Sequence, residues 1–297
     1  MTIDQSEEPI RKSKKMGLDD AVKSFLPPTV ESLAIGGMHL HNTPMSIVRE
    51  IIRQNIRIKR LITSPAASIN ADLLIGSGLV EEVVTPYIGF EHMGLAPAFR
   101  RITQEGRLKV LEVDEQTLIL ALRAAGSGQP FAPLPPGQGL SEVTKISPDF
   151  YRPTIDPFTG KKVLVTQPLK PQVAIFVAQQ ADEYGNALFK GSPFTDREML
   201  LAAEIVILQT EEIILNPQLT RNPLLVTVPG HLVNVVVAQR FGCHPTSSHR
   251  YYNYDEDHIK EYLKLATTKE GFEEYLSKYV LDLTEEEYLK RARIISN

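Results

Sequence analysis

The chain has 297 residues, of which 42% are hydrophobic and 23% are charged, and its formal net charge is −4. This composition is ordinary for a globular protein in water, and the length suffices for one large domain or two small ones. Because the chain has no basic excess, a nucleic-acid partner is not expected. The single cysteine, Cys243, cannot form an internal disulfide, which favours a reducing, cytoplasmic compartment.

Residues 1–15 are predicted to be a charged, flexible lead-in, and either Met1 or Met16 fits as the first residue. No long apolar run follows these charges. The segment therefore predicts neither a signal peptide nor a membrane span, and no membrane partner is expected. Residues 16–297 are predicted to form a single domain, with a helical C-terminal part at about 257–297.

The first folded element is a predicted helix over 18–25, stopped by Pro27 and Pro28. The apolar run SLAIGG follows and predicts a buried strand that ends at two glycines. Helices and strands then alternate in the order helix 44–56, strand 60–65, helix 71–78, strand 81–90, helix 95–106, strand 108–113 and helix 116–125. This alternation predicts an α/β fold with an open, mostly parallel sheet flanked by helices, since parallel strands need such crossovers.

The second half of the chain begins with an irregular segment. Residues 131–162 are rich in Pro and Gly and show no clear period, so we expect a long excursion over the surface. ADEYGNALF (181–189) predicts a tight turn with Gly185 or Asn186 at positive φ. The remaining predicted elements are strands at 162–167, 173–180, 205–214 and within 226–240, and helices at 198–204, 258–266, 271–280 and 284–293.

Common nucleotide-binding and hydrolase motifs are missing, because the sequence has no GxxxxGKS/T, no G-x-G-x-x-G and no G-x-S-x-G. His39 and His41 lie two residues apart, and His244 and His249 lie near Cys243. No carboxylate in the sequence pattern completes either pair, so no metal site is predicted. For Cys243, packing is favoured over a nucleophilic role, because a lone cysteine usually behaves as a small apolar residue.

One stretch, LAIGGMHLHNTP (33–44), is more specific. Two glycines let the backbone turn sharply off a strand end, where a substrate can approach the exposed N–H groups. The stretch resembles the A-subunit signature of family I CoA-transferases, which usually has Gly-Gly-Phe and then Gly-x-Pro. Here Met38 replaces the Phe and Asn42 replaces the Gly.

The likeness continues along the chain, in the same order, from about Leu18 to Arg293. It is carried by DDAVKSF, EEVVTPYIGFEHMGLAPAFRRITQEGRLKV, AAGSGQPFAP, ADEYGNA and GCHPTSSHRYYNYDEDHIKEY. The last of these is similar to a tract of the glutaconate CoA-transferase A subunit. The resemblance implies a CoA-transferase-like fold of the NagB/RpiA type.

The resemblance also implies a reaction and a partner. Family I CoA-transferases move CoA between carboxylic acids through an acyl anhydride and a glutamyl-CoA thioester. Coenzyme A is then expected as the acyl-CoA substrate, with no bound cofactor. The attacking glutamate belongs to the B subunit, in a motif like Ser-Glu-Asn-Gly that this chain lacks. The chain therefore resembles an A subunit that is active only with a B subunit, in a hetero-oligomer.

On this resemblance, the A subunit supplies the substrate-side wall of the active site. The expected substrate-binding residues are Gly36, Gly37, Met38, His39 and Asn42 in a first loop, and Gly89 and Phe90 in a second. For both loops a purely structural turn is the alternative interpretation.

Glu115 leaves the reaction class open. In an ungapped comparison anchored on Pro130-Phe131, the transferases have a Gln here that helps hold the thioester oxygen, whereas an ionised Glu can only accept hydrogen bonds. Asp114-Glu115 instead resembles a pair in the A subunits of steroid ring-opening CoA hydrolases, where the glutamate is the catalytic carboxylate. Capping and the helix dipole also favour acids at a helix start, and capping is the role expected for Asp114.

Three functions are compatible with the sequence. The first is a CoA-transferase A subunit, and the second is a hydrolase, lyase or decarboxylase of an acyl-CoA that uses Glu115. The third is a metabolite-sensing domain on the same scaffold, which the lack of an N-terminal helix-turn-helix disfavours. The acyl group is not indicated, although Arg100, Arg101 or His39 could pair with the second acid of a dicarboxylate.

Overall fold

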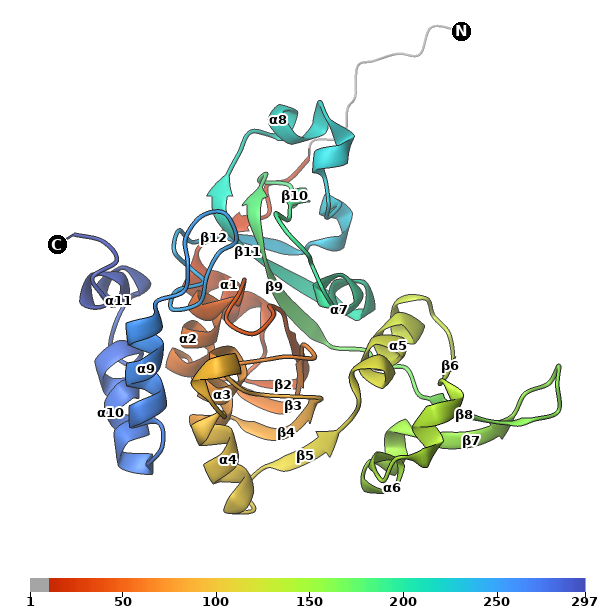
Figure 1. Ribbon diagram of the computed structural model, residues 1–297. Helices are drawn as coiled ribbons and strands as arrows, with labels where there is room; N and C mark the ends of the chain where they lie inside the picture. Colours follow the sequence, from red (N-terminus) through yellow and green to blue (C-terminus); the bar gives the residue numbers. More distant parts are fainter. Residues whose placement is uncertain (1–10, 297) are drawn as a thin grey trace, which may run out of the picture.

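The computed structural model describes residues 11–296 and shows an α/β fold, as predicted (Figure 1). All pairings along the main sheet are parallel, and only the short strand β10 runs antiparallel to its neighbour β9. The strand order is β1 (Lys15–Met16), β12 (Val235–Ala238), β11 (Ile205–Ile213), β9 (Val173–Ala181), β2 (Thr29–Ile35), β3 (Arg57–Thr63), β4 (Val80–Thr85) and β5 (Lys109–Glu112), with β10 (Ala187–Leu188) beside β9.

Helices cover both faces of this sheet, which explains the long apolar runs in strands such as β9 and β12. One face packs against α1 (Leu18–Phe25), α2 (Met45–Arg53), α3 (Ile69–Gly76) and α4 (Pro97–Gln104). The other face packs against α5 (Glu115–Gly126) and α7 (Asp196–Ala202). A further short helix, α8 (Asn216–Thr220), lies between β11 and β12 in the chain.

The helical C-terminal part forms an extra layer beside α2 and α3 (Figure 1). It consists of α9 (Glu256–Leu265), α10 (Lys269–Tyr279) and α11 (Glu285–Arg291). Two buried polar contacts attach it. Arg49 of α2 is 1% exposed, donates from Nε to Glu285 at 3.0 Å and stacks over the ring of Tyr288. Asp72 of α3 accepts a hydrogen bond of 2.6 Å from the hydroxyl of Tyr262.

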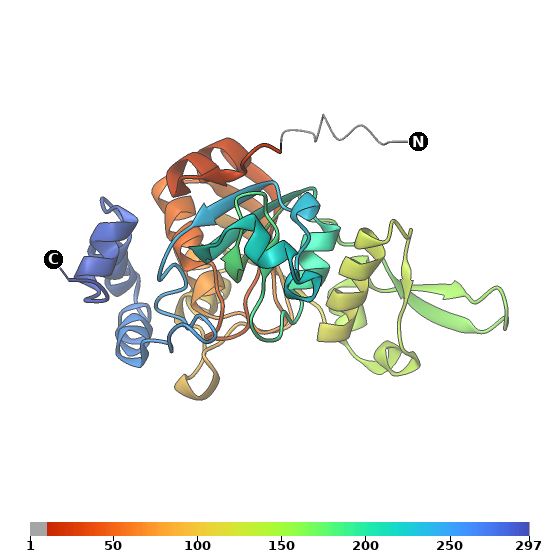
Figure 2. The same ribbon diagram turned by 90° about the horizontal axis from the view of Figure 1, so that it is seen from above.

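The segment 131–162 is not a purely irregular excursion. It contains β6 (Ala132–Pro133), α6 (Val143–Ile146) and β7 (Arg152–Ile155), and with β8 (Lys162–Thr166) it builds a second sheet in the order β6-β8-β7. Figure 2 shows the β7–β8 hairpin projecting away from the body of the protein. The proline and glycine content hid these short strands, because it disrupts the alternation by which strands are recognised.

Element boundaries differ from the prediction at several places, including the end of β4 and the N-terminal segment. The strand predicted over 81–90 ends as β4 at Thr85, because Pro86 has no N–H to continue the ladder. Most of the predicted lead-in, residues 1–10, lies outside the described residues. Its last two residues are fixed, since Lys14 donates from its backbone N to Glu183 and Lys15 pairs with β12.

The turn between β9 and β10 agrees with the sequence, because Gly185 has φ of 91°. None of the helices within residues 11–296 has both the length and the apolar character needed to cross a membrane.

Candidate active site

The glycine pair lies at the carboxyl end of β2, in the middle of the sheet. Gly36 donates from its N to the carbonyl of Ile175 at 2.9 Å, which continues the pairing with β9. Gly37 has φ of 94°, so the chain turns there in a conformation that strongly favours glycine. The predicted sharp turn off the strand is confirmed, and its substrate-binding role stays a prediction.

A buried carboxylate holds this turn. Asp196, the first residue of α7, accepts the N–H of Gly37 at 3.0 Å through Oδ1. A Cβ atom at Gly36 would lie 2.8 Å from the same Oδ1, so only glycine leaves room for the carboxylate. Burial raises the pKa of Asp196 to about 7, against the hydrogen bond from Gly37, which lowers it.

The following loop, 38–42, is closed by its own backbone. Met38 and His41 exchange two hydrogen bonds of 2.9 Å, and His39 between them has φ of 49°. The hydroxyl of Ser68 donates to the carbonyl of His39, which fixes the loop to the start of α3. Met38 and His39 remain partly exposed, so their side chains are available to a ligand.

Asn42 is a structural junction rather than an exposed contact. Its Oδ1 accepts hydrogen bonds of 2.9 Å from Nε2 of Gln179 and from the backbone N of His249. With φ of 53°, Asn42 occupies a conformation that glycine and asparagine adopt most readily. This explains how Asn replaces the glycine usual in the family signature. The side chain is 8% exposed, so it shapes the loop more than it lines a surface.

The second predicted loop is split between surface and core. Gly89 is held by a hydrogen bond of 3.0 Å from its N to the carbonyl of Ala67. Glu91, which is exposed, lies 3.6 Å from Nδ1 of His39 and thereby joins the two loops. Phe90, by contrast, is fully buried against Tyr262 of α9. The side chain of Phe90 is therefore part of the apolar core, and the predicted role of this residue in substrate binding stays a prediction.

His41 adds a titratable group at the same place. Its Nδ1 lies 2.7 Å from the hydroxyl of Ser247. Burial lowers its pKa, and the neighbouring imidazoles of His39 and His249 act in the same direction, while Glu91 opposes them. These effects favour the neutral imidazole, in which one ring nitrogen donates and the other accepts a hydrogen bond.

Asp114 and Glu115 have separate roles in the structure. Asp114 is the N-cap of α5 and accepts from the backbone N of Thr117 at 2.9 Å, as predicted. It also accepts from the hydroxyl of Tyr151 at 2.8 Å and from Nε2 of Gln138 at 2.7 Å. Glu115 is exposed, and no other side chain within residues 11–296 forms a hydrogen bond or ion pair with it.

Glu115 follows β5, and the glycine turn follows β2, so both lie at the carboxyl edge of the same parallel sheet. In open α/β sheets this edge is where ligands bind. Two strands, β3 and β4, separate the two features, and the Gly89 loop follows β4.

Arg100 and Arg101 lie on α4, where Arg101 packs over the ring of Phe272 at 5.9 Å.

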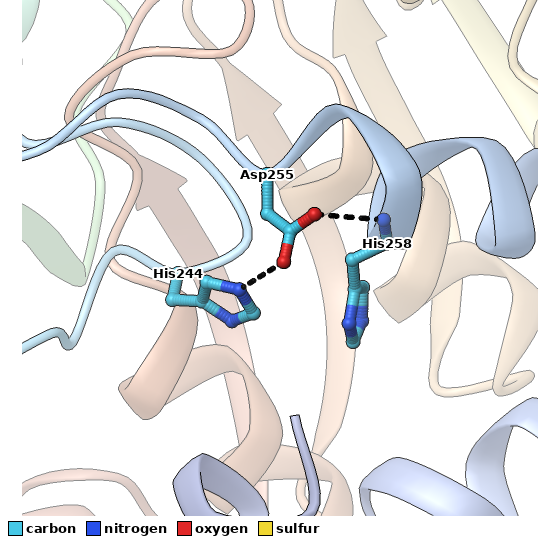
Figure 3. A group of neighbouring side chains, drawn as sticks. All are labelled: His244, Asp255 and His258. Carbon is cyan, nitrogen blue, oxygen red and sulfur yellow. Dashed lines mark hydrogen bonds and ion pairs between the residues drawn. The ribbon is translucent and has the colours of Figure 1, made fainter. Parts of the chain in front are cut away.

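A group of possible metal ligands lies elsewhere, at the start of α9 (Figure 3). Asp255 lies beside His244, so the structure supplies the carboxylate that the sequence pattern did not, and His258 is the third member. The histidine rings already have partners. His244 contacts the hydroxyl of Tyr288 through Nδ1 at 2.7 Å and Asp255 through Nε2 at 3.1 Å, and His258 contacts the hydroxyl of Tyr275 through Nε2 at 2.9 Å. The three side chains therefore belong to a hydrogen-bonded network that includes the hydroxyls of Tyr288 and Tyr275.

Cys243 is fully buried, in agreement with the predicted packing role. Burial raises the pKa of its thiol well above the ordinary value, and the nearby carboxylate of Glu211 adds to this, so a reactive thiolate is disfavoured.

Sequence reasoning missed Asp196 and Gln179, which fix the glycine turn and the HLHN loop. No motif marks either residue, and only the fold brings them to residues that lie more than a hundred positions earlier.

Comparison with known proteins agrees with this arrangement. The family model described as Coenzyme A transferase matches residues 16–239. The chain belongs to this family. It is 30% identical over 295 residues to the A subunit of glutaconate CoA-transferase from Acidaminococcus fermentans, covering 94% of this chain and 92% of that one. The crystal structure of that enzyme superimposes with a TM-score of 0.87 at 31% identity, covering 94% and 92% of the two chains.

Two further relatives bear on length and reaction. An uncharacterized protein of Archaeoglobus fulgidus is 37% identical over 90% of this chain, but the chain spans only 59% of that protein's length. The cholesterol ring-cleaving hydrolase IpdA subunit of Mycobacterium tuberculosis is 28% identical, covering 93% of this chain and 95% of that one. The family thus includes both transferase subunits and a hydrolase subunit on one scaffold.

Proposed function

We propose that the chain is the A subunit of a cytoplasmic, hetero-oligomeric CoA-transferase that moves CoA between carboxylic acids. The observation that supports this most directly is the glycine turn at the carboxyl edge of the sheet, which a hydrogen bond to Asp196 holds in place. It presents backbone and partly exposed side chains of loop 38–42 to a substrate, as a binding wall does. The relatives named as CoA-transferase A subunits support the same assignment.

In the proposed reaction, the nucleophile comes from a B subunit. Its glutamate attacks the acyl-CoA thioester, which expels the CoA thiolate and forms an acyl-glutamyl anhydride. The thiolate then attacks the glutamyl carbonyl, which releases the first carboxylic acid and leaves a glutamyl-CoA thioester. The free acid then accepts CoA by the reverse steps. The present chain contributes the wall opposite this glutamate, orients the acyl group against loop 38–42 and helps to exclude water.

The test uses the chain purified together with a B subunit that carries the glutamate motif. Acyl-CoA is added, the enzyme is treated with borohydride, and both subunits are analysed by mass spectrometry. We expect the thioester to be trapped on the B subunit, and no exchange from the present chain alone. A complex that binds acyl-CoA but neither forms a thioester nor exchanges CoA would refute transfer.

A matched pair of variants tests the glycine turn itself. Gly36→Ala places a Cβ 2.8 Å from Asp196 Oδ1, so it should displace the turn and reduce exchange by about tenfold or more. Gly137→Ala is the control, because a Cβ there meets nothing within 4 Å. Equal exchange rates for the two variants would show that the turn is not part of the substrate-binding wall.

The runner-up is a ring-opening hydrolase, or a lyase or decarboxylase, of a keto acyl-CoA. The freedom of Glu115 favours it, because Asp114 alone performs the capping and leaves Glu115 exposed beside it. A carboxylate with no structural partner is available as a base.

Glu115→Gln separates the two functions. A transferase should keep its exchange rate or gain, since Gln can donate a hydrogen bond to the thioester oxygen and Glu cannot. A hydrolase that uses Glu115 as its base should lose about 10²-fold or more of its activity. Steady-state rates of CoA exchange and of thioester hydrolysis, measured on the same preparation, distinguish these outcomes.

A further inference from the structure

The β7–β8 hairpin carries apolar side chains that the rest of residues 11–296 leaves uncovered. Phe158 at its tip is 95% exposed and Ile155 at the end of β7 is 55% exposed. Ile146, in α6 at the base of the hairpin, is 60% exposed. Phe158 and Ile155 thus place two large, exposed apolar side chains on one protruding hairpin, and exposed apolar surface of this kind is typical of interaction sites.

The hairpin is nevertheless built to keep its shape. The backbone N of Asp156 donates to the carbonyl of Lys161 at 2.9 Å, and its carboxylate accepts from the backbone N of Phe158 at 2.9 Å. Gly160 has φ of 68°, as the return of the turn requires. Phe158 is thus presented by an ordered turn and not by a loose loop, which lowers the entropic cost of docking it.

The charges of the hairpin are unbalanced. Over residues 152–166 it has three cations, Arg152, Lys161 and Lys162, and one carboxylate, Asp156, which is engaged in the turn. A surface that receives this hairpin therefore needs an apolar socket for Phe158 with carboxylates at its rim.

The base of the hairpin lies next to Glu115. Tyr151, immediately before β7, and Gln138 both donate hydrogen bonds to Asp114, the residue before Glu115. The hairpin consequently leaves the body at the carboxyl edge of β5, the edge at which the glycine turn lies. A protein that covers this edge to complete the active site would therefore also contact the hairpin.

We propose that the β7–β8 hairpin is a docking arm for the B subunit, with Phe158 inserted into an acid-rimmed apolar socket of that subunit. This inference rests on the proposed function, which requires a second polypeptide over the carboxyl edge. The relative from Archaeoglobus fulgidus, whose length this chain only partly spans, carries further polypeptide within one chain. A second copy of the present chain is the competing occupant that the experiment must distinguish.

The experiment measures association of the full-length chain with its B subunit, by isothermal titration calorimetry. Phe158→Ser should weaken binding by about tenfold or more, as loss of a buried aromatic anchor does. Leu224→Ser is the matched control, because Leu224 is also nearly fully exposed, at 89%, but lies outside the hairpin. It should bind like the unaltered chain. Since Phe158 makes no core contact, its variant should keep an unchanged melting temperature.

A photo-crosslinking arm identifies the occupant. With p-benzoylphenylalanine at position 158, irradiation of the complex should link the hairpin to the B subunit. Crosslinks only to a second copy of this chain, or Phe158→Ser binding as tightly as the control, would overturn the proposal and leave the proposed function intact. Failure of the unaltered chain to bind any B subunit would overturn both.

Discussion

At the scale of single residues, the decisive contact joins Gly37 to Asp196. An ionised carboxylate in the core costs free energy, and the backbone hydrogen bond from Gly37 offsets only part of this cost. Burial therefore raises its pKa to about 7, from the value near 4 expected in the unfolded chain. The folded state favours the protonated form, so the stability linked to Asp196 is full below about pH 4 and is lost as pH rises through 7.

Asp196→Asn tests this. The amide cannot titrate but can still accept the N–H of Gly37. Relative to the Asn variant, the unaltered chain should lose on the order of 2–4 kcal/mol of stability between pH 4 and pH 8. Urea unfolding at a series of pH values gives this difference. Parallel curves for the two proteins would show that Asp196 does not titrate in this range.

The glycine turn could be located from the sequence, but the carboxylate of Asp196 that holds it could not. A Gly-Gly pair after an apolar strand has a local physical meaning, whereas Asp196 looks like any acid at a helix start. The same holds for Asp255, which is readable as a helix cap but not as the neighbour of His244. Contacts between distant segments leave no periodic trace in one sequence, so they could not be predicted.

At the scale of elements, the C-terminal helices depend on neutral histidines. Burial lowers the pKa of His244 to about 4. Burial and the proximity of His244 together lower the pKa of His258 to about 3. Their contribution to stability is thus full above the unfolded pKa near 6.5 and is lost as pH falls towards 4. The pKa of Asp255 is also lowered, although burial opposes this. The stability linked to its carboxylate is therefore likewise lost as pH falls.

We therefore expect acid to loosen α9, α10 and α11 before the main sheet. Amide hydrogen exchange at pH 7 and pH 4.5, corrected for the intrinsic rate, should show lost protection in these helices and retained protection in β2 and β3. In His258→Gln, which cannot be protonated there, the loss should be smaller by on the order of 1–3 kcal/mol. Uniform loss across sheet and helices would argue against a local cause.

Element order was the part of the fold that could be predicted best. Strands such as β2 and helices such as α2 have a clear apolar period and are long enough to show it. The hairpin arm failed this criterion, because β7 is four residues long and contains Pro153. Its exposed strands are not selected for a buried face, so the pattern that reveals strands is missing there.

At the scale of the whole molecule, one buried ion pair joins distant parts of the chain. Arg49 is 1% exposed and Glu285 is 7% exposed, and the two lie 236 positions apart. Glu285→Ala should destabilise the protein by about 3–5 kcal/mol, because it leaves a buried charge without its partner. The double variant Arg49→Met/Glu285→Leu should recover most of this loss, as measured by thermal unfolding. A double variant as unstable as the single one would point to lost packing.

The same ion pair has a consequence for biosynthesis. When a ribosome has made the whole sheet up to β12, Arg49 still has no carboxylate to meet, because Glu285 is incorporated only in the last helix, α11. Completion of this part of the core must therefore wait until α11 has left the ribosomal exit tunnel, and a message truncated before codon 285 should yield a product that quality-control proteases remove.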